Sequence, residues 1–220
     1  MKNKNEGEEE NIKIILLGDC GVGKTNIISR YLNDEFRDEE LSTFASYYLK
    51  KELVINGKKL IIDIWDTAGQ ERYLSITKIL VQDANIIILV YSVVEPDSFQ
   101  HLDIWLNNVI DINKNDFILG ICGNKIDLID EEKVSEKEAQ KYANEHNATF
   151  KLVSAKEDKI GIDNLFETLL TKYINSDTWS SKKVQKIKVK KEKINKDNIL
   201  IYKLLKKFFL KKINIFNYKI

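Results

Sequence analysis

The sequence predicts an α/β domain built on a largely parallel β-sheet with helices on both faces. Between Ile12 and about Ile174, short apolar runs alternate with amphipathic segments. The runs are rich in Ile, Leu and Val at consecutive positions, which is typical of central strands whose two faces are both buried. Five runs are expected to be strands: residues 12–17, 61–65, 86–91, 117–122 and 150–153.

A sixth strand is predicted from a hairpin signal within residues 44–65. Asn56-Gly57 lies between two strand-like stretches there, and this dipeptide favours a two-residue turn between antiparallel strands. We therefore expect six strands, one of them an antiparallel strand at the edge of the sheet. Pro96 and the Ser-Glu-Lys-Glu stretch at Ser135 are typical helix starts. Helices are expected to begin near Lys24, Glu71, Asp97, Ser135 and Ile162.

Charge is distributed unevenly along the 220 residues. The formal net charge is +1, but residues 182–220 contain 14 Lys and two acidic residues, which gives that segment +12 and leaves −11 for the rest. Only two cysteines are present, far apart, which favours a reducing compartment over a disulfide framework. We expect a short disordered acidic lead (residues 1–11), one domain (12–175) and a basic tail (176–220). With neither a secretory signal nor an apolar run of membrane-spanning length, the protein is expected in the cytoplasm.

The most specific motif reads G-D-C-G-V-G-K-T and directly follows the first predicted strand. Glycines let successive backbone N–H groups converge on phosphate oxygens, and the helix that follows adds the positive end of its dipole. In this context the lysine is expected to reach the β- and γ-phosphates and the threonine hydroxyl to bind Mg²⁺. The predicted nucleotide-binding loop comprises Gly18, Asp19, Cys20, Gly21, Val22, Gly23, Lys24 and Thr25.

Two later motifs indicate that the base is guanine. The carboxylate of Asp127 can accept hydrogen bonds from guanine N1–H and from the exocyclic amine. Adenine lacks this donor pair and would leave the carboxylate unsatisfied, at a cost of about 1–3 kcal/mol. The Ala155 N–H, at the end of the next strand, can meet guanine O6. The predicted base-binding residues are Asn124, Lys125, Asp127, Ser154, Ala155 and Lys156.

The stretch W-D-T-A-G-Q-E-R at residues 65–72 also stands at a strand end. Asp66 can hold Mg²⁺ through water, and the Gly69 N–H can meet a γ-phosphate. Gln70 can orient the water that attacks this phosphate. Lys24, Gly69 and Gln70 are therefore the predicted catalytic residues.

Together, GDCGVGKT, WDTAGQER, NKID and SAK, in this order and spacing, resemble a small GTPase of the Ras superfamily over about residues 12–175. The resemblance implies the P-loop NTPase fold and a GTP/GDP switch that requires Mg²⁺. It further implies that Phe36 packs on the edge of the guanine. Thr43 is implied to close on Mg²⁺ and the γ-phosphate. Because no arginine near the loop is an obvious finger in cis, a GTPase-activating protein is expected to accelerate a slow intrinsic hydrolysis.

Within the superfamily, WDTAGQERY, the hairpin ELVINGKKLIIDIW and VYSVVEPDSF resemble the Rab branch more than Ras, Rho or Arf. The resemblance implies vesicle transport and a peripheral position on the cytoplasmic face of an endomembrane. It also implies an effector-reading patch at Tyr48, Trp65 and Leu80. A monomer is expected, with exchange factor, activating protein and effectors contacting residues around 40–50 and 66–82. Nucleic acid is not an expected partner.

Ala45 departs from the family pattern, which has glycine two residues after the switch threonine, and the following Ser-Tyr-Tyr departs as well. These changes concern the surface that partners read more than the nucleotide chemistry. Two alternatives to a Rab-like GTPase stay open: a Ras-like signalling GTPase, and a guanine-nucleotide-binding module with negligible turnover. His101 and His146 are expected to face solvent, and Trp105 is expected in the core.

The sequence has no cysteine after Cys122 that could be prenylated. The tail therefore needs another explanation, and three interpretations are open. Residues 199–213 can form a basic amphipathic helix that binds anionic membrane. Alternatively, the Lys-, Ile- and Asn-rich composition reflects AT-rich sequence outside the true coding region. A disordered basic tail that binds RNA or a partner is the third interpretation. The intact mass of the protein from its native cell distinguishes a real tail from a misread one.

Overall fold

The structure, a computed structural model, describes residues 10–38, 47–55, 57–67, 80–113, 116–177 and 179. Its centre is a six-stranded sheet with the strand order β2-β3-β1-β4-β5-β6. β2 pairs antiparallel with β3, and the other pairs are parallel. The predicted fold class is therefore confirmed. The strands are β1 (Glu10–Leu17), β2 (Tyr47–Ile55), β3 (Lys58–Asp66), β4 (Ile86–Ser92), β5 (Ile118–Asn124) and β6 (Thr149–Leu152).

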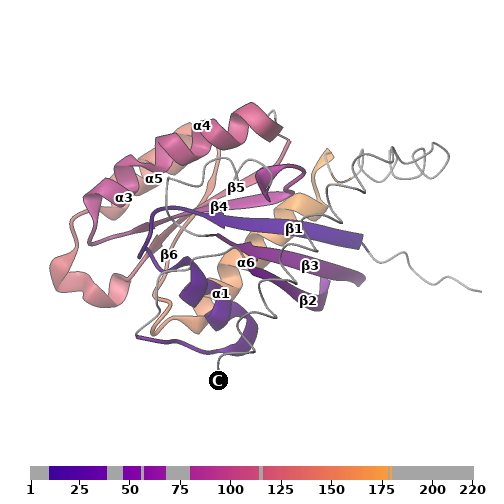
Figure 1. The fold of residues 1–220 in the computed structure, drawn as a ribbon, viewed down its shortest axis with the longest axis horizontal. Helices are drawn as coiled ribbons and strands as arrows, with labels where there is room; N and C mark the ends of the chain where they lie inside the picture. Colours follow the sequence, from indigo (N-terminus) through magenta and orange to yellow (C-terminus); the bar gives the residue numbers. More distant parts are fainter. Residues whose placement is uncertain are drawn as a thin grey trace, which may run out of the picture. The chain divides into compact units, whose positions relative to one another are not determined.

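Helices cover both faces of the sheet, with α1 and α6 on one side and α3, α4 and α5 on the other (Figure 1). The elements are α1 (Lys24–Asn33), α3 (Pro96–Gln100), α4 (Leu102–Asn113), a 3₁₀ helix η2 (Ile126–Glu131), α5 (Glu136–Glu145) and α6 (Lys159–Ile174). The helix expected near Glu71 lies outside the described residues. Among the helices that are described, none is long and apolar enough to cross a membrane.

Several boundaries differ from the predictions, among them the starts of β1, β3 and α6. β1 begins at Glu10, inside the predicted lead, because Glu10 pairs with Leu60 of β3. α6 begins at Lys159 rather than near Ile162, because the Asp158 carboxylate accepts a 2.7 Å hydrogen bond from the Gly161 N–H and so caps the first turn. The helix expected from Asp97 is divided into α3 and α4.

Other local predictions hold. The Ser135 hydroxyl accepts the Glu138 N–H at 3.3 Å and caps α5 as expected. β2 and β3 form the predicted hairpin, in which Gly57 has φ +74°, a conformation that suits glycine. Asn56 lies outside the described residues.

The core consists of two apolar layers, one on each face of the sheet. All seven residues of β4 are buried, as a central strand requires. On β1, Ile15 and Leu17 pack into the cluster that contains Trp105 and Leu106 of α4. Because successive strand residues point to opposite faces, Ile14 and Leu16 face the layer of α1 and α6. The strand ends that carry the motifs are thus held rigidly from both sides.

Gly123, the penultimate residue of β5, has no space for a side chain. A Cβ atom there would lie 2.5 Å from the Tyr91 hydroxyl oxygen and 2.6 Å from a Leu152 methyl group. Both neighbours would have to move, and Tyr91 is fully buried. Gly123→Ala is therefore expected to lower the free energy of unfolding by about 1–3 kcal/mol, measured by urea denaturation.

Gly120→Ala, on the same strand, is the matched control. Its Cβ atom would meet a flexible methyl group of Leu169 at 2.9 Å, so we expect a smaller loss, below about 1 kcal/mol. Equal losses for the two variants would contradict this account of Gly123.

Candidate functional site

Two glycines of the loop between β1 and α1, Gly18 and Gly23, could not be replaced by another residue without a clash. A Cβ atom on Gly18 would lie 2.1 Å from the Val90 carbonyl oxygen, and one on Gly23 would lie 2.3 Å from the Asn124 Nδ2 atom. Gly23 also has φ +96°. This loop therefore packs directly against β4 and the end of β5, immediately before α1.

Lys24, the first residue of α1, folds back over this loop. Its ammonium donates to the carbonyl oxygens of Gly18 (2.8 Å) and Asp19 (2.7 Å), and the residue is only 6% exposed. Burial lowers the pKa of Lys24 to about 8, against the opposing effect of the Asp66 carboxylate. A buried cation beside an N-terminus without a side-chain cap is suited to an anion, which would favour the charged lysine.

Asp66, the last residue of β3, lies beside the start of α1. Its carboxylate accepts a 2.7 Å hydrogen bond from the Thr25 hydroxyl, and the residue is 2% exposed. The next residue, Thr67, donates its hydroxyl to the Leu16 carbonyl oxygen at 2.7 Å, which fixes the end of β3 against β1. The structure thus places two predicted metal-binding residues together, and their hard oxygen atoms fit Mg²⁺.

Asn124 joins the phosphate-binding loop to the predicted base-binding loop. Its Nδ2 donates to the Val22 carbonyl oxygen at 2.9 Å, and its Oδ1 accepts the Ala155 N–H at 3.0 Å. The Asn124 carbonyl oxygen accepts the Val93 N–H at 3.0 Å. With its side chain 2% exposed, Asn124 holds three loops in one place. The Ala155 N–H, which was predicted to meet guanine O6, therefore already has Asn124 Oδ1 as its acceptor.

Asp127 is oriented by the third motif. The Ser154 hydroxyl donates to Asp127 Oδ1 at 2.6 Å, and the same hydroxyl accepts the Lys156 N–H (3.2 Å) and the Glu157 N–H (3.0 Å). One carboxylate oxygen is therefore held by the protein. Asp127 lies in η2, a short helix that the sequence did not predict. Lys125 precedes it at φ 72°, and the Lys125 ammonium pairs with Glu95 at 3.0 Å.

Some of the remaining predicted residues belong to the described structure, and others lie outside it. Phe36 is half-buried in the segment after α1. Thr43, Gly69 and Gln70 lie outside the described residues, so their roles stay predictions. In the predicted effector patch, Tyr48 and Trp65 pair across β2 and β3 with ring centroids 5.2 Å apart. Leu80 is half-buried against the core cluster.

A contact that sequence reasoning missed holds the phosphate-binding loop from the helix side. The Asp19 carboxylate lies 2.9 Å from Trp105 Nε1, which donates to it, and 2.6 Å from His101 Nδ1. His101 is exposed, as expected, with 47% of its side chain accessible, but it also contacts the loop. Trp105 is buried as expected, at 3% exposure. The spacing of four residues between His101 and Trp105 places both on one helical face and was the available signal.

Similarity to known proteins identifies the family. The sequence profile of the Ras family matches residues 13–175. The chain belongs to the Ras family. Ras-related protein Rab-21 of Mus musculus is 41% identical over 170 residues, which cover 77% of this chain and 76% of that protein.

Two further relatives point to the same branch. GTP-binding protein ypt3 of Schizosaccharomyces pombe is 36% identical over 159 residues, covering 72% of this chain and 74% of that protein. Ras-related protein RABA2a of Arabidopsis thaliana is 36% identical over 159 residues, covering 72% and 73%. The chain is thus a Rab-like small GTPase that binds guanine nucleotide, as predicted.

The contact of Asp19 with Trp105 gives a first test of this Rab-like site. A carboxylate within a phosphate-binding loop repels phosphate unless donors hold it aside, and Trp105→Phe removes one donor while keeping an apolar ring. We expect GDP to dissociate roughly three- to tenfold faster, corresponding to a loss of about 1 kcal/mol. Fluorescent-nucleotide release measures this.

Tyr142→Phe is the matched control for the loss of one hydrogen bond. The Tyr142 hydroxyl donates to Asp103 at 2.8 Å, and neither residue belongs to the site. Its GDP release is expected to equal that of the unaltered protein. Unchanged release in Trp105→Phe would show that the Asp19 contact is unimportant for nucleotide binding.

Proposed function

We propose that the site described above binds GTP or GDP together with Mg²⁺ and hydrolyses GTP as a timed switch in vesicle transport. The observation that carries this proposal is the convergence of the glycine loop with Lys24, the Thr25–Asp66 pair and the Asn124–Asp127 base site. The Rab names of the relatives support the transport role.

In the proposed site, the phosphates lie against the loop amides and the N-terminus of α1. The Lys24 ammonium, which donates to two loop carbonyl oxygens, turns towards the β- and γ-phosphates and stabilises the charge that develops during hydrolysis. Mg²⁺, when bound, neutralises the β- and γ-phosphate oxygens. The Thr25 hydroxyl is its proposed direct ligand, and Asp66 holds it through water.

Hydrolysis is proposed to depend on residues of the two switch segments. Thr43 closes on the γ-phosphate side and adds a further ligand for the metal. The Gly69 N–H contacts the γ-phosphate, and Gln70 orients the attacking water. Loss of the γ-phosphate removes these contacts, and the segments around Thr43 and Gly69 are then released, which is the switch.

Partner proteins are proposed to bind those same segments. Exchange factor, GTPase-activating protein and effectors contact residues around 40–50 and 66–82, and the effector patch is Tyr48, Trp65 and Leu80. The paired rings of Tyr48 and Trp65, with Tyr48 46% exposed, support an aromatic contact surface. We propose a monomer that acts peripherally on the cytoplasmic face of an endomembrane.

Base recognition is tested by reversing the hydrogen bonding at Asp127. Asp127→Asn replaces an acceptor by an amide that can donate to the O2 atom of xanthine. We expect GDP affinity to fall by about a hundredfold or more, because N1–H and the exocyclic amine of guanine lose their shared acceptor. Xanthosine diphosphate should then bind better than GDP, as measured by competition with a fluorescent nucleotide.

Glu95→Gln is the control for this substitution, because it neutralises a nearby carboxylate that pairs with Lys125 and has no proposed contact with the base. It is expected to keep the preference for GDP. If Asp127→Asn still prefers GDP over xanthosine diphosphate, Asp127 does not read the base.

Turnover is tested by single-turnover hydrolysis with Gln70→Leu. Removal of the amide that orients water should slow hydrolysis by on the order of tenfold or more, while GTP affinity stays unchanged. This result also separates the timed switch from a binding module with negligible turnover. A Gln70→Leu protein that hydrolyses GTP as fast as the unaltered one would refute the proposed role of Gln70.

A further inference from the structure

Arg30, near the C-terminal end of α1, makes a set of contacts that the proposed function does not use. Its Nε donates to the Ala155 carbonyl oxygen at 2.9 Å and its Nη2 to the Lys156 carbonyl oxygen at 2.8 Å. Its Nη1 donates to the Asp34 carbonyl oxygen at 3.0 Å and to the Asp34 carboxylate at 2.7 Å. The Arg30 side chain is only 15% exposed.

These contacts require an arginine. A guanidinium presents donors in a rigid planar fork, so its three nitrogens can serve three residues at once. Ala155 and Lys156 are about 125 residues away along the chain, so the contacts join two distant segments. A surface ion pair alone would contribute little, but the charged donor to the partly buried Ala155 carbonyl group contributes more.

The first segment that Arg30 holds is the loop at Ser154–Lys156. Arg30 binds the carbonyl side of this loop, whereas the loop's N–H and hydroxyl groups face Asn124 and Asp127. The guanidinium therefore fixes the loop from behind. Movement of the loop would change both the position of the Ala155 N–H and the support that Ser154 supplies to Asp127.

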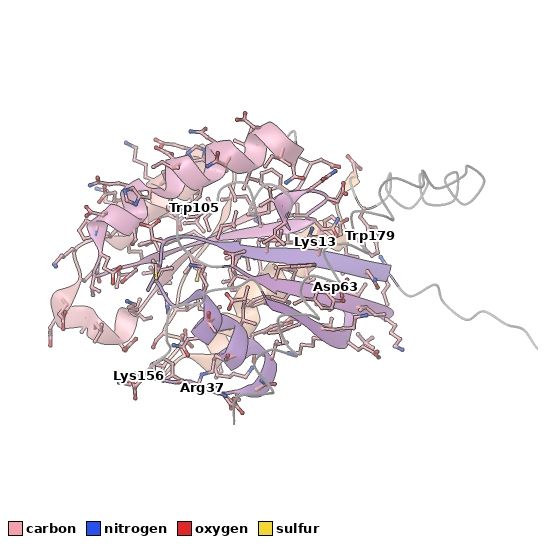
Figure 2. The ribbon with its side chains drawn as sticks, viewed as in Figure 1. Lys13, Arg37, Asp63, Trp105, Lys156 and Trp179 are labelled. Carbon is pink, nitrogen blue, oxygen red and sulfur yellow. The ribbon has the colours of Figure 1, made fainter. Side chains whose placement is uncertain are left out.

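The second segment is the stretch after α1 that contains Phe36. Arg30 holds its beginning at Asp34. The Asn26 side chain holds its end by donating to the Arg37 carbonyl oxygen at 3.1 Å and accepting the Arg37 N–H at 3.2 Å. Figure 2 shows Arg37 and Lys156 near the same end of the molecule, beside α1. A 3.9 Å ion pair between Lys156 and Asp38 joins the two segments.

We propose that Arg30 is a positioning residue for guanine recognition, which locks the Ala155–Lys156 loop to the helix that carries the phosphate-binding loop. Arg30 touches no nucleotide in this account. Together with Asn124, it sets the distance between the phosphate site and the atoms that read position 6 of the base, and it supports the Phe36 segment on the other side. The inference rests on the proposed base site.

The experiment combines Arg30 variants with a change at position 6 of the ligand. The ligands are GDP and 6-thio-GDP, in which a larger sulfur that accepts hydrogen bonds weakly replaces O6 while N1–H and the amine remain. Release rates and affinities are measured for the full chain and for Arg30→Gln, with Arg37→Gln as control. The Arg37 side chain is 70% exposed, and the Asn26 contacts use its backbone only.

The expected results are specific to Arg30. GDP release accelerates on the order of tenfold in Arg30→Gln and is unchanged in Arg37→Gln. The unaltered protein prefers GDP to 6-thio-GDP, and this preference falls towards one in Arg30→Gln, because the carbonyl side of the loop is no longer held. A residue that merely stabilised the fold would weaken both ligands equally and leave the preference intact.

Arg30→Lys keeps the charge and the partner Asp34, but one ammonium cannot reach both loop carbonyl groups in the same way. It should show faster GDP release and a reduced preference, and it decides the question if Arg30→Gln does not fold. A preference equal to that of the unaltered protein in both folded variants would overturn the role of Arg30. If the unaltered protein does not distinguish the two ligands, the proposed reading of position 6 by the loop fails instead.

Discussion

The geometry of the site depends on the hydrogen bonds of the Asn124 amide side chain. It is buried at the end of β5, where it donates to the phosphate-binding loop at Val22 and accepts from the base-binding loop at Ala155. Both loops connect a parallel strand to a helix, and the carboxyl ends of these strands lie at the same edge of the sheet. One side chain can therefore set the distance between the two halves of a nucleotide site.

Glycines are required close to that contact. Gly23 must lack a side chain because Asn124 Nδ2 occupies the space a Cβ atom would need, and Gly123 must lack one because of Tyr91 and Leu152. The absence of side chains lets three backbone segments approach closely enough to share hydrogen bonds. Lys24 shows a related preorganisation, since its ammonium already lies across the loop, where phosphate oxygens can replace the carbonyl groups.

Two further contacts hold the site from the helices behind it. Trp105 and His101 bind Asp19 from one side of the sheet, and Arg30 binds Ala155 and Lys156 from the other. These side chains touch no ligand in the proposed mechanism, but they position the residues that bind the ligand. The rate of nucleotide release is therefore expected to depend on them.

The sequence alone determined the fold class, the order in which the strand-end motifs follow one another along the chain, and membership of the Ras family. Apolar runs, a glycine loop and short motifs at strand ends are local signals whose physical meaning does not need the rest of the chain. Only the tertiary structure decided how β1 extends to Glu10, that Asp158 caps α6, that His101 contacts Asp19 and that Arg30 reaches Ala155. Three of these contacts are long-range. The fourth is the cap by Asp158, which binds the N–H of Gly161, a residue type that disfavours a helix when the local sequence is considered alone. The sequence shows the chemistry of a charged or aromatic side chain. Which group it contacts depends on how closely the folded sheet brings distant segments together.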